Sequence, residues 1–177
     1  MYNRIDKFLS EEEKMTNIVD SFLSEEEHLE LLDHVLYKTP WMYTKGVSSP
    51  HDDGFKFSIT MFKNWFWEMD PEPFKNILRR LETTAMVRMH MNMTFLGHTP
   101  DQNYHRDSDH PAVMAAVYYI NDTNGGTMFE DGEFVEGKAN RFVTFPANKP
   151  HKVVGHTEGE AHRVILNINY IPYKIVL

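Results

Sequence analysis

The second half of this 177-residue chain alternates polar and apolar side chains, and this period of two limits the fold more than any other feature. The clearest stretch interleaves four polar with four apolar residues: Arg88, His90, Asn92 and Thr94 alternate with Val87, Met89, Met91 and Met93. Such alternation is typical of a β-strand with one face toward a core. Turn-bounded segments predict further short strands at residues 112–120, 127–130, 133–135, 141–145, 153–154 and 163–170. Many short strands with turns between them predict a sandwich or a barrel.

Helical patterns are confined to the first half of the chain. Residues 25–37 carry apolar side chains at helical spacing and follow Ser24, whose Ser-x-x-Glu sequence is a capping box. Residues 71–84 show a second apolar stripe, and the pair Asp70-Pro71 supplies a capping side chain and a proline at the first helical position. We therefore expect two amphipathic helices.

Shorter patterns complete the first half. The sequence Phe-Leu-Ser-Glu-Glu-Glu that opens the first helix also occurs at residues 8–13, where it precedes a brief helical pattern at residues 15–19. Residues 41–44 and 55–67 are expected as strands, the second of them rich in aromatic side chains. Helices followed by strands indicate helices packed outside a β core.

The expected fold class is therefore mainly β with packed helices. A chain of 177 residues can bury a substantial core, and no composition shift divides it, so we expect one domain over residues 1–177. Within it, residues 1–85 are expected to support a core at residues 86–171 that carries the site.

The composition argues against several classes of function. A formal charge of −8 is unfavourable for non-specific nucleic-acid binding, which needs a basic surface. The chain has no cysteine, so disulfides, thiolate zinc sites and cysteine nucleophiles are excluded. No apolar run approaches the ~20 residues of a membrane span, and the N-terminus lacks a signal peptide's apolar core. We expect a cytoplasmic protein, and the sequence predicts no oligomeric state.

The candidate chemistry begins at the sequence Tyr104-His105-Arg106-Asp107. On an extended segment, His105 and Asp107 point to the same face with Cα atoms roughly 6.5–7 Å apart. An imidazole and a carboxylate on one face are two thirds of the 2-His-1-carboxylate triad that holds non-haem Fe(II). The same His-x-acid pattern recurs at three other pairs: His28/Glu30, His51/Asp53 and His156/Glu158.

These three other pairs lack the context of a metal site. The first lies inside the helix at residues 25–37, where residues two apart face different sides. The second lies in a loop and has no later histidine and arginine at a comparable spacing. The third lies in a turn flanked by glycines, where we expect its histidine to face solvent.

The candidate for the second histidine of the triad is His151. It stands 44 residues after Asp107 and follows residues 140–146, an apolar strand that ends in proline. Twelve residues later Arg163 opens the last strand, and its planar guanidinium suits a carboxylate held through two hydrogen bonds. This order can hold a metal and a dicarboxylic co-substrate beside it.

Two alternatives remain open. The Asp109-His110 pair can supply a ligand if the strand bulges, because Asp109 shares a face with Asp107. His90 is the other candidate interior histidine, in a core or cleft role or as a ligand.

Taken together, the order and spacing of six pieces of sequence are specific. They are Tyr104-His105-Arg106-Asp107, Val117-Tyr118-Tyr119-Ile120-Asn121, Gly125-Gly126-Thr127-Met128-Phe129, Asn140-Arg141-Phe142-Val143-Thr144-Phe145-Pro146, His151 and residues 163–170. In this order they resemble the Fe(II)- and 2-oxoglutarate-dependent oxygenase superfamily, in particular its prolyl-4-hydroxylase-like branch and similar small bacterial and phage oxygenases. The resemblance covers roughly residues 86–171.

The resemblance implies a double-stranded β-helix, or jelly-roll, core with the N-terminal helices outside it. It implies that His105, Asp107 and His151 bind Fe(II) and are the catalytic residues, and that Arg163 pairs with the distal carboxylate of 2-oxoglutarate. Three protein ligands leave positions on the iron for 2-oxoglutarate and O2. Ascorbate is a candidate additional reductant.

Three further residues are implied to bind the co-substrate. Tyr119 is the second tyrosine of a Tyr-Tyr-x-Asn strand whose counterpart contacts 2-oxoglutarate in the relatives. Asn167 stands four positions after Arg163, where the relatives place a hydroxyl residue. The strand before the His-x-Asp motif often contributes a tyrosine, and Asn92 or Thr94 would have to substitute for it here.

The implied activity is a dioxygenase reaction that couples oxidative decarboxylation of 2-oxoglutarate to succinate with hydroxylation of a substrate. Asp107 argues against halogenation, because related halogenases lack this carboxylate. The expected partner is a peptide or small-molecule substrate, with a peptidyl-prolyl or other peptide side chain favoured, and neither nucleic acid nor a membrane is indicated. A nucleobase or small metabolite is the alternative substrate, and a non-catalytic metal-binding jelly-roll module is the alternative function.

Overall fold

The computed structural model describes residues 15–47, 51, 53–99 and 102–173. Its elements in chain order are β1 (Asn17–Val19), α1 (Glu25–Tyr37), β2 (Met42–Lys45), β3 (Phe55–Lys63), β4 (Phe66–Trp67), the 3-10 helix η2 (Glu72–Phe74), α2 (Lys75–Arg80), β5 (Thr83–Phe95), β6 (Met114–Tyr119), β7 (Gly126–Phe129), β8 (Phe134–Glu136), β9 (Arg141–Pro146), β10 (His151–Val154) and β11 (His162–Pro172). Strands dominate, as the alternation predicts.

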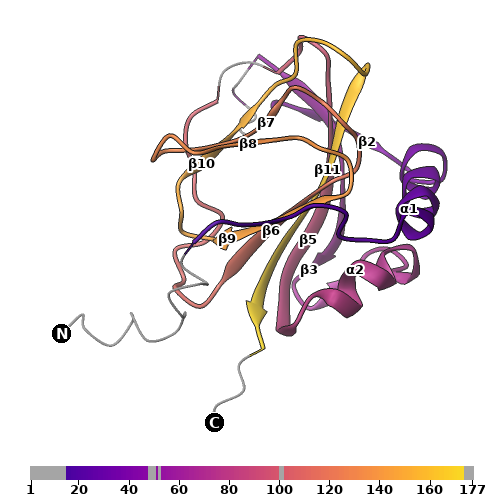
Figure 1. The fold of residues 1–177 in the computed structure, drawn as a ribbon, viewed down its shortest axis with the longest axis vertical. Coiled ribbons are helices and arrows are strands. Elements are labelled where there is room, and N and C mark those ends of the chain that lie inside the picture. The colour runs from indigo at the N-terminus through magenta and orange to yellow at the C-terminus, as the bar shows by residue number, and fades with distance from the viewer. Residues whose placement is uncertain (1–14, 48–50, 52, 100–101, 174–177) are drawn as a thin grey trace.

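The strands form two antiparallel sheets. The larger sheet has the order β1-β9-β6-β11-β5-β3-β2, with β4 paired to β3, and the smaller sheet has the order β10-β7-β8. The smaller sheet lies across from the larger one, so that the strands enclose an interior (Figure 1). Apolar side chains from both sheets meet there, among them Val117, Phe129 and Phe145. This arrangement is a jelly roll and confirms the predicted fold class.

Both α-helices lie outside the larger sheet, on its other face (Figure 1). α1 starts at the predicted capping box, in which the Ser24 side chain and the Glu27 side chain each accept a hydrogen bond from the other residue's backbone N–H. The outward side chains of β5, including Met89 and Met91, are completely buried with Ile77 of α2 in a second apolar core. Helices packed outside a β core are confirmed.

A buried polar contact joins α1 to the larger sheet. His28 Nδ1 lies 2.6 Å from the hydroxyl of Tyr118, which in turn donates to Asn140 Oδ1 at 3.0 Å. The Asn140 amide also bonds both the backbone N–H and the carbonyl of Leu23. The Asn140 side chain therefore holds the segment before α1 in place, because it bonds backbone groups that a neighbouring strand would otherwise bond.

Three predicted elements differ in the structure. The brief pattern at residues 15–19 contains the strand β1, which pairs with β9 instead of forming a helix, whereas the sequence copy at residues 8–13 lies outside the described residues. The predicted helix at residues 71–84 is shorter and ends at Arg80, because the backbone becomes extended at Leu81 before β5 starts at Thr83.

The predicted strand at residues 55–67 is a hairpin. Asn64 and Trp65 have φ of 52° and 68°, in the left-handed region, and reverse the chain between β3 and β4. Two successive left-handed residues are the signature of a tight turn that matches the twist of the flanking strands. The alternation of polar and apolar side chains continues across the turn, so the sequence pattern does not indicate where the turn lies. Among the described residues, no helix has the length and apolar character needed to cross a bilayer.

Candidate functional site

His105 and His151 face each other across two antiparallel segments. The backbone N–H of each donates to the carbonyl of the other at 2.9 Å, which makes them a directly opposed pair whose side chains share one face. The His105 segment thus extends the smaller sheet beside β10. The two ring centroids are 4.5 Å apart.

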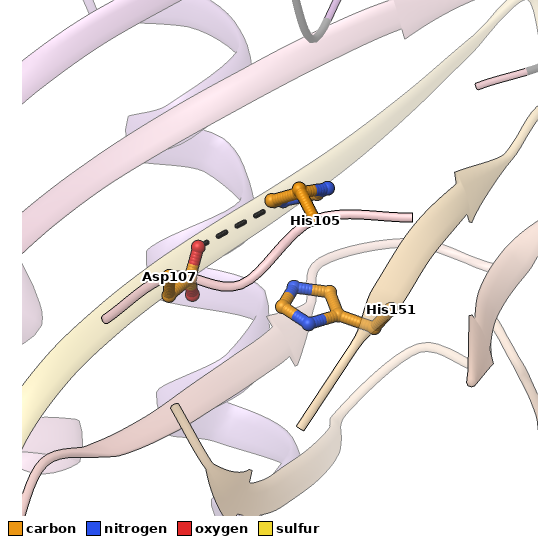
Figure 2. A group of neighbouring side chains, drawn as sticks. All are labelled: His105, Asp107 and His151. Atoms are coloured by element: carbon orange, nitrogen blue, oxygen red, sulfur yellow. Dashed lines mark ion pairs between the residues drawn. The ribbon is translucent and has the colours of Figure 1, made fainter. Parts of the chain in front are cut away.

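Asp107 completes the cluster from a segment that belongs to no named strand. Its backbone N–H donates to the carbonyl of Ala147 at 2.9 Å, which ties the segment to the turn before β10. Figure 2 shows the three side chains pointing toward one another, with Asp107 Oδ1 3.8 Å from His105 Nε2. One ligand atom from each of His105, Asp107 and His151 lies within 4.8 Å of the others. The structure brings the three predicted ligands together.

Hydrogen bonds orient both imidazoles. His151 Nδ1 lies 2.9 Å from the carbonyl of Lys149, so Nδ1 carries the proton and Nε2 keeps its lone pair. His105 also forms a hydrogen bond with the backbone of Asn103. Burial and the neighbouring His151 lower the pKa of His105, which favours the neutral imidazole that binds metals.

Two side chains from the larger sheet hold the carboxylate. Asn169 Nδ2 donates to Asp107 Oδ2 at 3.0 Å, and Arg88 Nη2 lies 3.8 Å from Oδ1. Asn169 and Arg88 are register partners on β11 and β5. These contacts orient the carboxylate as the outer partners of a metal ligand do. Sequence reasoning missed both residues, although each sits on the polar face of a strand that the alternation identifies.

A cavity of about 290 Å³ opens beside the cluster. Six of the seven predicted site residues line it: His105, Asp107, His151, Arg163, Asn92 and Asn167. The polar face of β11 runs along its floor, and register pairs Arg163 with Thr94, Asn167 with His90, and Asn169 with Arg88. The cavity thus extends from a metal-ligand cluster at one end to Arg163 at the other.

Arg163 is buried at the deep end and only 2% exposed. Its Nη2 donates to the carbonyl of Gly126 at 3.3 Å, while its Nε bonds no atom of the residues that the structure describes. In the described part of the chain no carboxylate forms an ion pair with it. Burial lowers the pKa of Arg163, but a guanidinium stays protonated in proteins. A buried cation without an anion is costly, so this geometry indicates an anionic ligand.

Tyr119, the seventh predicted residue, lies behind this end. Its hydroxyl is 2.7 Å from Thr127 Oγ1, and the Arg163 guanidinium carbon is 5.4 Å from the centre of its ring. Burial raises the pKa of Tyr119, so the phenol stays protonated. Thr127 lines the cavity, whereas Tyr119 supports Thr127 and Arg163 from below.

The residues present fit a metal and a dicarboxylate. The donor set of two imidazoles and a carboxylate is the set that non-haem Fe(II) sites use. Register places Gly126, which Arg163 contacts, three residues along β7 from Phe129, the partner of His151. Three residues of strand span roughly 10 Å. An extended five-carbon dicarboxylate with its contacts at both ends matches this span.

The alternative histidines have other environments. His28 bonds Tyr118 under α1, as described above. Burial and the nearby Arg88 lower the pKa of His90 to about 3, so His90 is a neutral cavity residue that lies outside the triad cluster. The prediction that His156 faces solvent is wrong, because it is 1% exposed and its Nε2 bonds the carbonyl of Glu160 at 3.0 Å.

The other acidic candidates also lie outside the cluster. Asp109 is exposed and its carboxylate lies 3.7 Å from Arg106, so the Asp109-His110 pair adds no ligand atom to the described cluster. His51 and Asp53 belong to no ligand group in the described residues.

The protein is a jelly roll that carries a 2-His-1-carboxylate cluster beside a buried arginine. Several solved structures have the same fold. A prolyl hydroxylase bound to a hypoxia inducible factor peptide fragment, from Trichoplax adhaerens, is 14% identical with a TM-score of 0.65 over 94% of this chain and 86% of that chain. The viral collagen prolyl hydroxylase of Paramecium bursaria Chlorella virus 1, in a 2-oxoglutarate complex, is 12% identical with a TM-score of 0.58 over 92% and 98%. The non-haem α-ketoglutarate-dependent carbocyclase SnoK of nogalamycin biosynthesis is 15% identical with a TM-score of 0.64 over 95% and 85%.

The chain therefore has the fold of the Fe(II)- and 2-oxoglutarate-dependent oxygenases, including those of the prolyl hydroxylase type. At this level of identity the likeness concerns the fold. No protein-family model and no curated protein sequence matches the chain.

Proposed function

We propose that the protein is an Fe(II)- and 2-oxoglutarate-dependent dioxygenase that hydroxylates a second substrate. The observation that carries this proposal is one cavity with a triad of His105, Asp107 and His151 at its open end and the unpaired, buried Arg163 at its deep end. A metal cluster alone suits many proteins. The addition of a buried cation without a carboxylate partner selects a site for an anionic co-substrate.

The triad residues would hold the metal. His105 and His151 offer neutral imidazoles, and the hydrogen bond from His151 to the Lys149 carbonyl sets the tautomer that can bind through Nε2. The Asn169 amide donates a hydrogen bond to Asp107 Oδ2. Asp107 Oδ1 is then left on the side of the two imidazoles. When bound, iron and 2-oxoglutarate together activate O2 for hydroxylation as the co-substrate loses CO2 and becomes succinate.

Arg163 would neutralise the distal carboxylate of 2-oxoglutarate. Thr94 lies opposite Arg163 in register and has a buried hydroxyl without a hydrogen-bond partner, and Thr127 adds a second hydroxyl. Asn92 and Asn167 occupy the next two positions toward the triad and would contact the body of the co-substrate. Val117 and Ile165 line the cavity between them and exclude water from one wall.

A peptide side chain is the substrate we favour. Two solved structures with this fold are prolyl hydroxylases, and one of them holds a peptide. A small metabolite is the second candidate, because the carbocyclase with this fold belongs to the biosynthesis of a small molecule. A non-catalytic metal-binding module does not account for the buried charge of Arg163, which forms no ion pair with a carboxylate of the described residues.

The test is to add Fe(II) and 2-oxoglutarate without oxygen and to record the visible spectrum and the melting temperature. We expect the weak visible charge-transfer band of the chelate and a higher melting temperature. A protein that shows neither change does not bind the co-substrate, and the dioxygenase proposal is then wrong.

A further inference from the structure

We propose that the substrate carries a carboxylate beside the atom that is oxidised, and that Arg88 and His90, with Lys56 nearby, bind it. This inference deepens the proposed dioxygenase function and rests on it. It concerns the part of the cavity floor that lies away from Arg163. The proposed position of the co-substrate leaves this part of the floor without a ligand.

Two buried donors in this part of the cavity have no acceptor in the part of the chain that the structure describes. His90 Nε2 lies 3.3 Å from the amide nitrogen of Asn167, which can only donate, so Nε2 accepts and the ring proton is on Nδ1. His90 Nδ1 and Arg88 Nε are both buried N–H groups without a hydrogen-bond partner among the described residues. Buried donors are satisfied in nearly all native structures. A ligand that accepts from both would satisfy them.

The charge around these donors is positive. Arg88 and Lys56 line the cavity with Arg163, and Asp107 is the one carboxylate among the described residues that line it. Burial lowers the pKa of His90 to about 3. The positive charges of Arg88 and Lys56 also lower this pKa, and each has a larger effect than the Asp107 carboxylate, which raises it. His90 therefore stays a neutral donor in a positive field. An anion, and in particular a planar carboxylate, is the acceptor that an arginine binds best.

Register places this anion site next to the chemistry. Arg88 lies opposite Asn169, the residue that holds Asp107, and Arg88 itself is 3.8 Å from Asp107. A carboxylate bound at Arg88 and His90 therefore anchors a substrate within one or two side chains of the triad. The cavity of about 290 Å³ is at the small end for ligand sites, so the group that enters is small.

Two other cationic side chains that line the cavity, Arg106 and Lys152, lie against groups of their own. Arg106 pairs with Asp109 at 3.7 Å, and the Lys152 ammonium lies 5.1 Å from the centre of the Tyr104 ring. The carboxylate itself can come from an acidic residue in a peptide or from a small organic acid. The chemistry that Arg88 and His90 recognise is the same in both cases.

The experiment uses calorimetry to titrate matched acids and amides into the protein. The protein is first loaded with Mn(II) and saturating 2-oxoglutarate, because this complex forms without turnover. The peptide pair is N-acetyl-Gly-Asp-Gly amide and its asparagine counterpart, the small pair is butyrate and butyramide, and inorganic phosphate is the third probe. We expect at least one acid to bind about 10- to 100-fold more tightly than its amide. The pair that discriminates identifies the source of the carboxylate.

Variants assign this preference to the residues. Arg88→Gln should reduce the acid-to-amide ratio to about threefold or less, and Lys56→Gln should reduce it in part. Lys63→Gln, which removes an exposed lysine from the same strand as Lys56, is the matched control and should leave the ratio unchanged. Because Arg88 also contacts Asp107, the affinities of Arg88→Gln for Mn(II) and 2-oxoglutarate are measured first, and the acids and amides are then titrated at concentrations of both that saturate the variant.

Three results would overturn the inference: equal binding of every acid and its amide, a ratio that survives Arg88→Gln, or tighter binding of phosphate than of every acid. Failure of the dioxygenase proposal gives a different result, because 2-oxoglutarate then shows no binding heat in the first titration. In that case the acid and amide arms are run on the protein without co-substrate.

Discussion

At the deep end of the cavity Arg163 projects from β11, a central strand of the larger sheet, and is 2% exposed. At the open end the His105 side chain is 45% exposed and lies outside every named strand. Arg163 is held by strand pairing with Thr94 of β5, and its neighbour Val164 bonds Ile120 and Asn121, which follow β6. The metal-ligand end depends more on individual hydrogen bonds, which the carbonyls of Ala147 and Lys149 accept and the Asn169 amide donates.

This difference suits the two tasks. A rigid, dry end makes a charge pair strong, because a low dielectric and a fixed geometry favour an anion over water. An end built from an irregular segment leaves access for O2 and a substrate. Substitutions at the two ends should therefore separate metal binding, co-substrate binding and turnover from one another.

The largest effect is expected at the metal-ligand end from Asp107→Ala. Loss of the carboxylate removes one of the three metal ligands. Because loss of an outer partner of a ligand already costs up to about 100-fold, we expect succinate production to fall by more than about 100-fold. Asp109→Ala is the matched control, since Asp109 is exposed and two residues away. Normal succinate production by Asp107→Ala would contradict the ligand assignment.

The next effect is expected at the deep end from Arg163→Ala. Removal of one partner of a buried charge pair costs about 2–5 kcal/mol, so 2-oxoglutarate affinity should fall by at least about 30-fold while metal affinity stays unchanged. Calorimetry with 2-oxoglutarate and Mn(II) measures both. Arg80→Ala, which removes a surface arginine paired with Glu27, controls for loss of charge. If Arg163→Ala also loses the metal, the two ends are not separable and the role of Arg163 is wrong.

A smaller effect is expected from Asn169→Ala, which removes the donor to Asp107 Oδ2. An outer partner of a metal ligand contributes about 10- to 100-fold in metal affinity, and the affinity for 2-oxoglutarate in metal-saturated protein should change little. Metal titration of the variant checks this. Asn124→Ala is the control, because the Asn124 amide bonds Thr157 and Glu158 at the surface. Unchanged metal affinity in Asn169→Ala would show that the Asp107 position is set by its backbone and Arg88 without the Asn169 amide.

The sequence predicts the positions of residues along a strand better than the contacts between strands, for a physical reason. Alternation assigns a face to every residue of a strand, so the polar row of β5 and the position of Arg163 on β11 follow from local pattern. The bond between Asn169 and Asp107 joins residues 62 positions apart. It depends on a register between strands that no local pattern contains.

The errors have the same origin. Glycines around His156 indicate a turn, but that turn folds onto the end of β5, where the Gly97 N–H donates to the His156 carbonyl at 3.2 Å. A side chain on Gly155 would collide with Thr99, whose Cβ lies 2.5 Å from the position that a Cβ would take. Burial of a turn is a tertiary property. The shortened α2 and the β3–β4 hairpin are likewise decided by the next strand, which the helical and alternating patterns do not include.

The smallest effect separates two adjacent tyrosines on opposite faces of β6. Tyr119 supports Thr127 and Arg163 by one hydroxyl, whereas Tyr118 faces α1 and bonds His28. Loss of one neutral hydrogen bond costs about 0.5–1.5 kcal/mol, so Tyr119→Phe should weaken 2-oxoglutarate binding by about two- to tenfold. Tyr118→Phe should lower the melting temperature without this loss of affinity, because its hydroxyl joins the helix layer to the sheet. Equal 2-oxoglutarate affinities in the two variants would show that the deep end depends on the Arg163 guanidinium and not on the hydroxyl behind it.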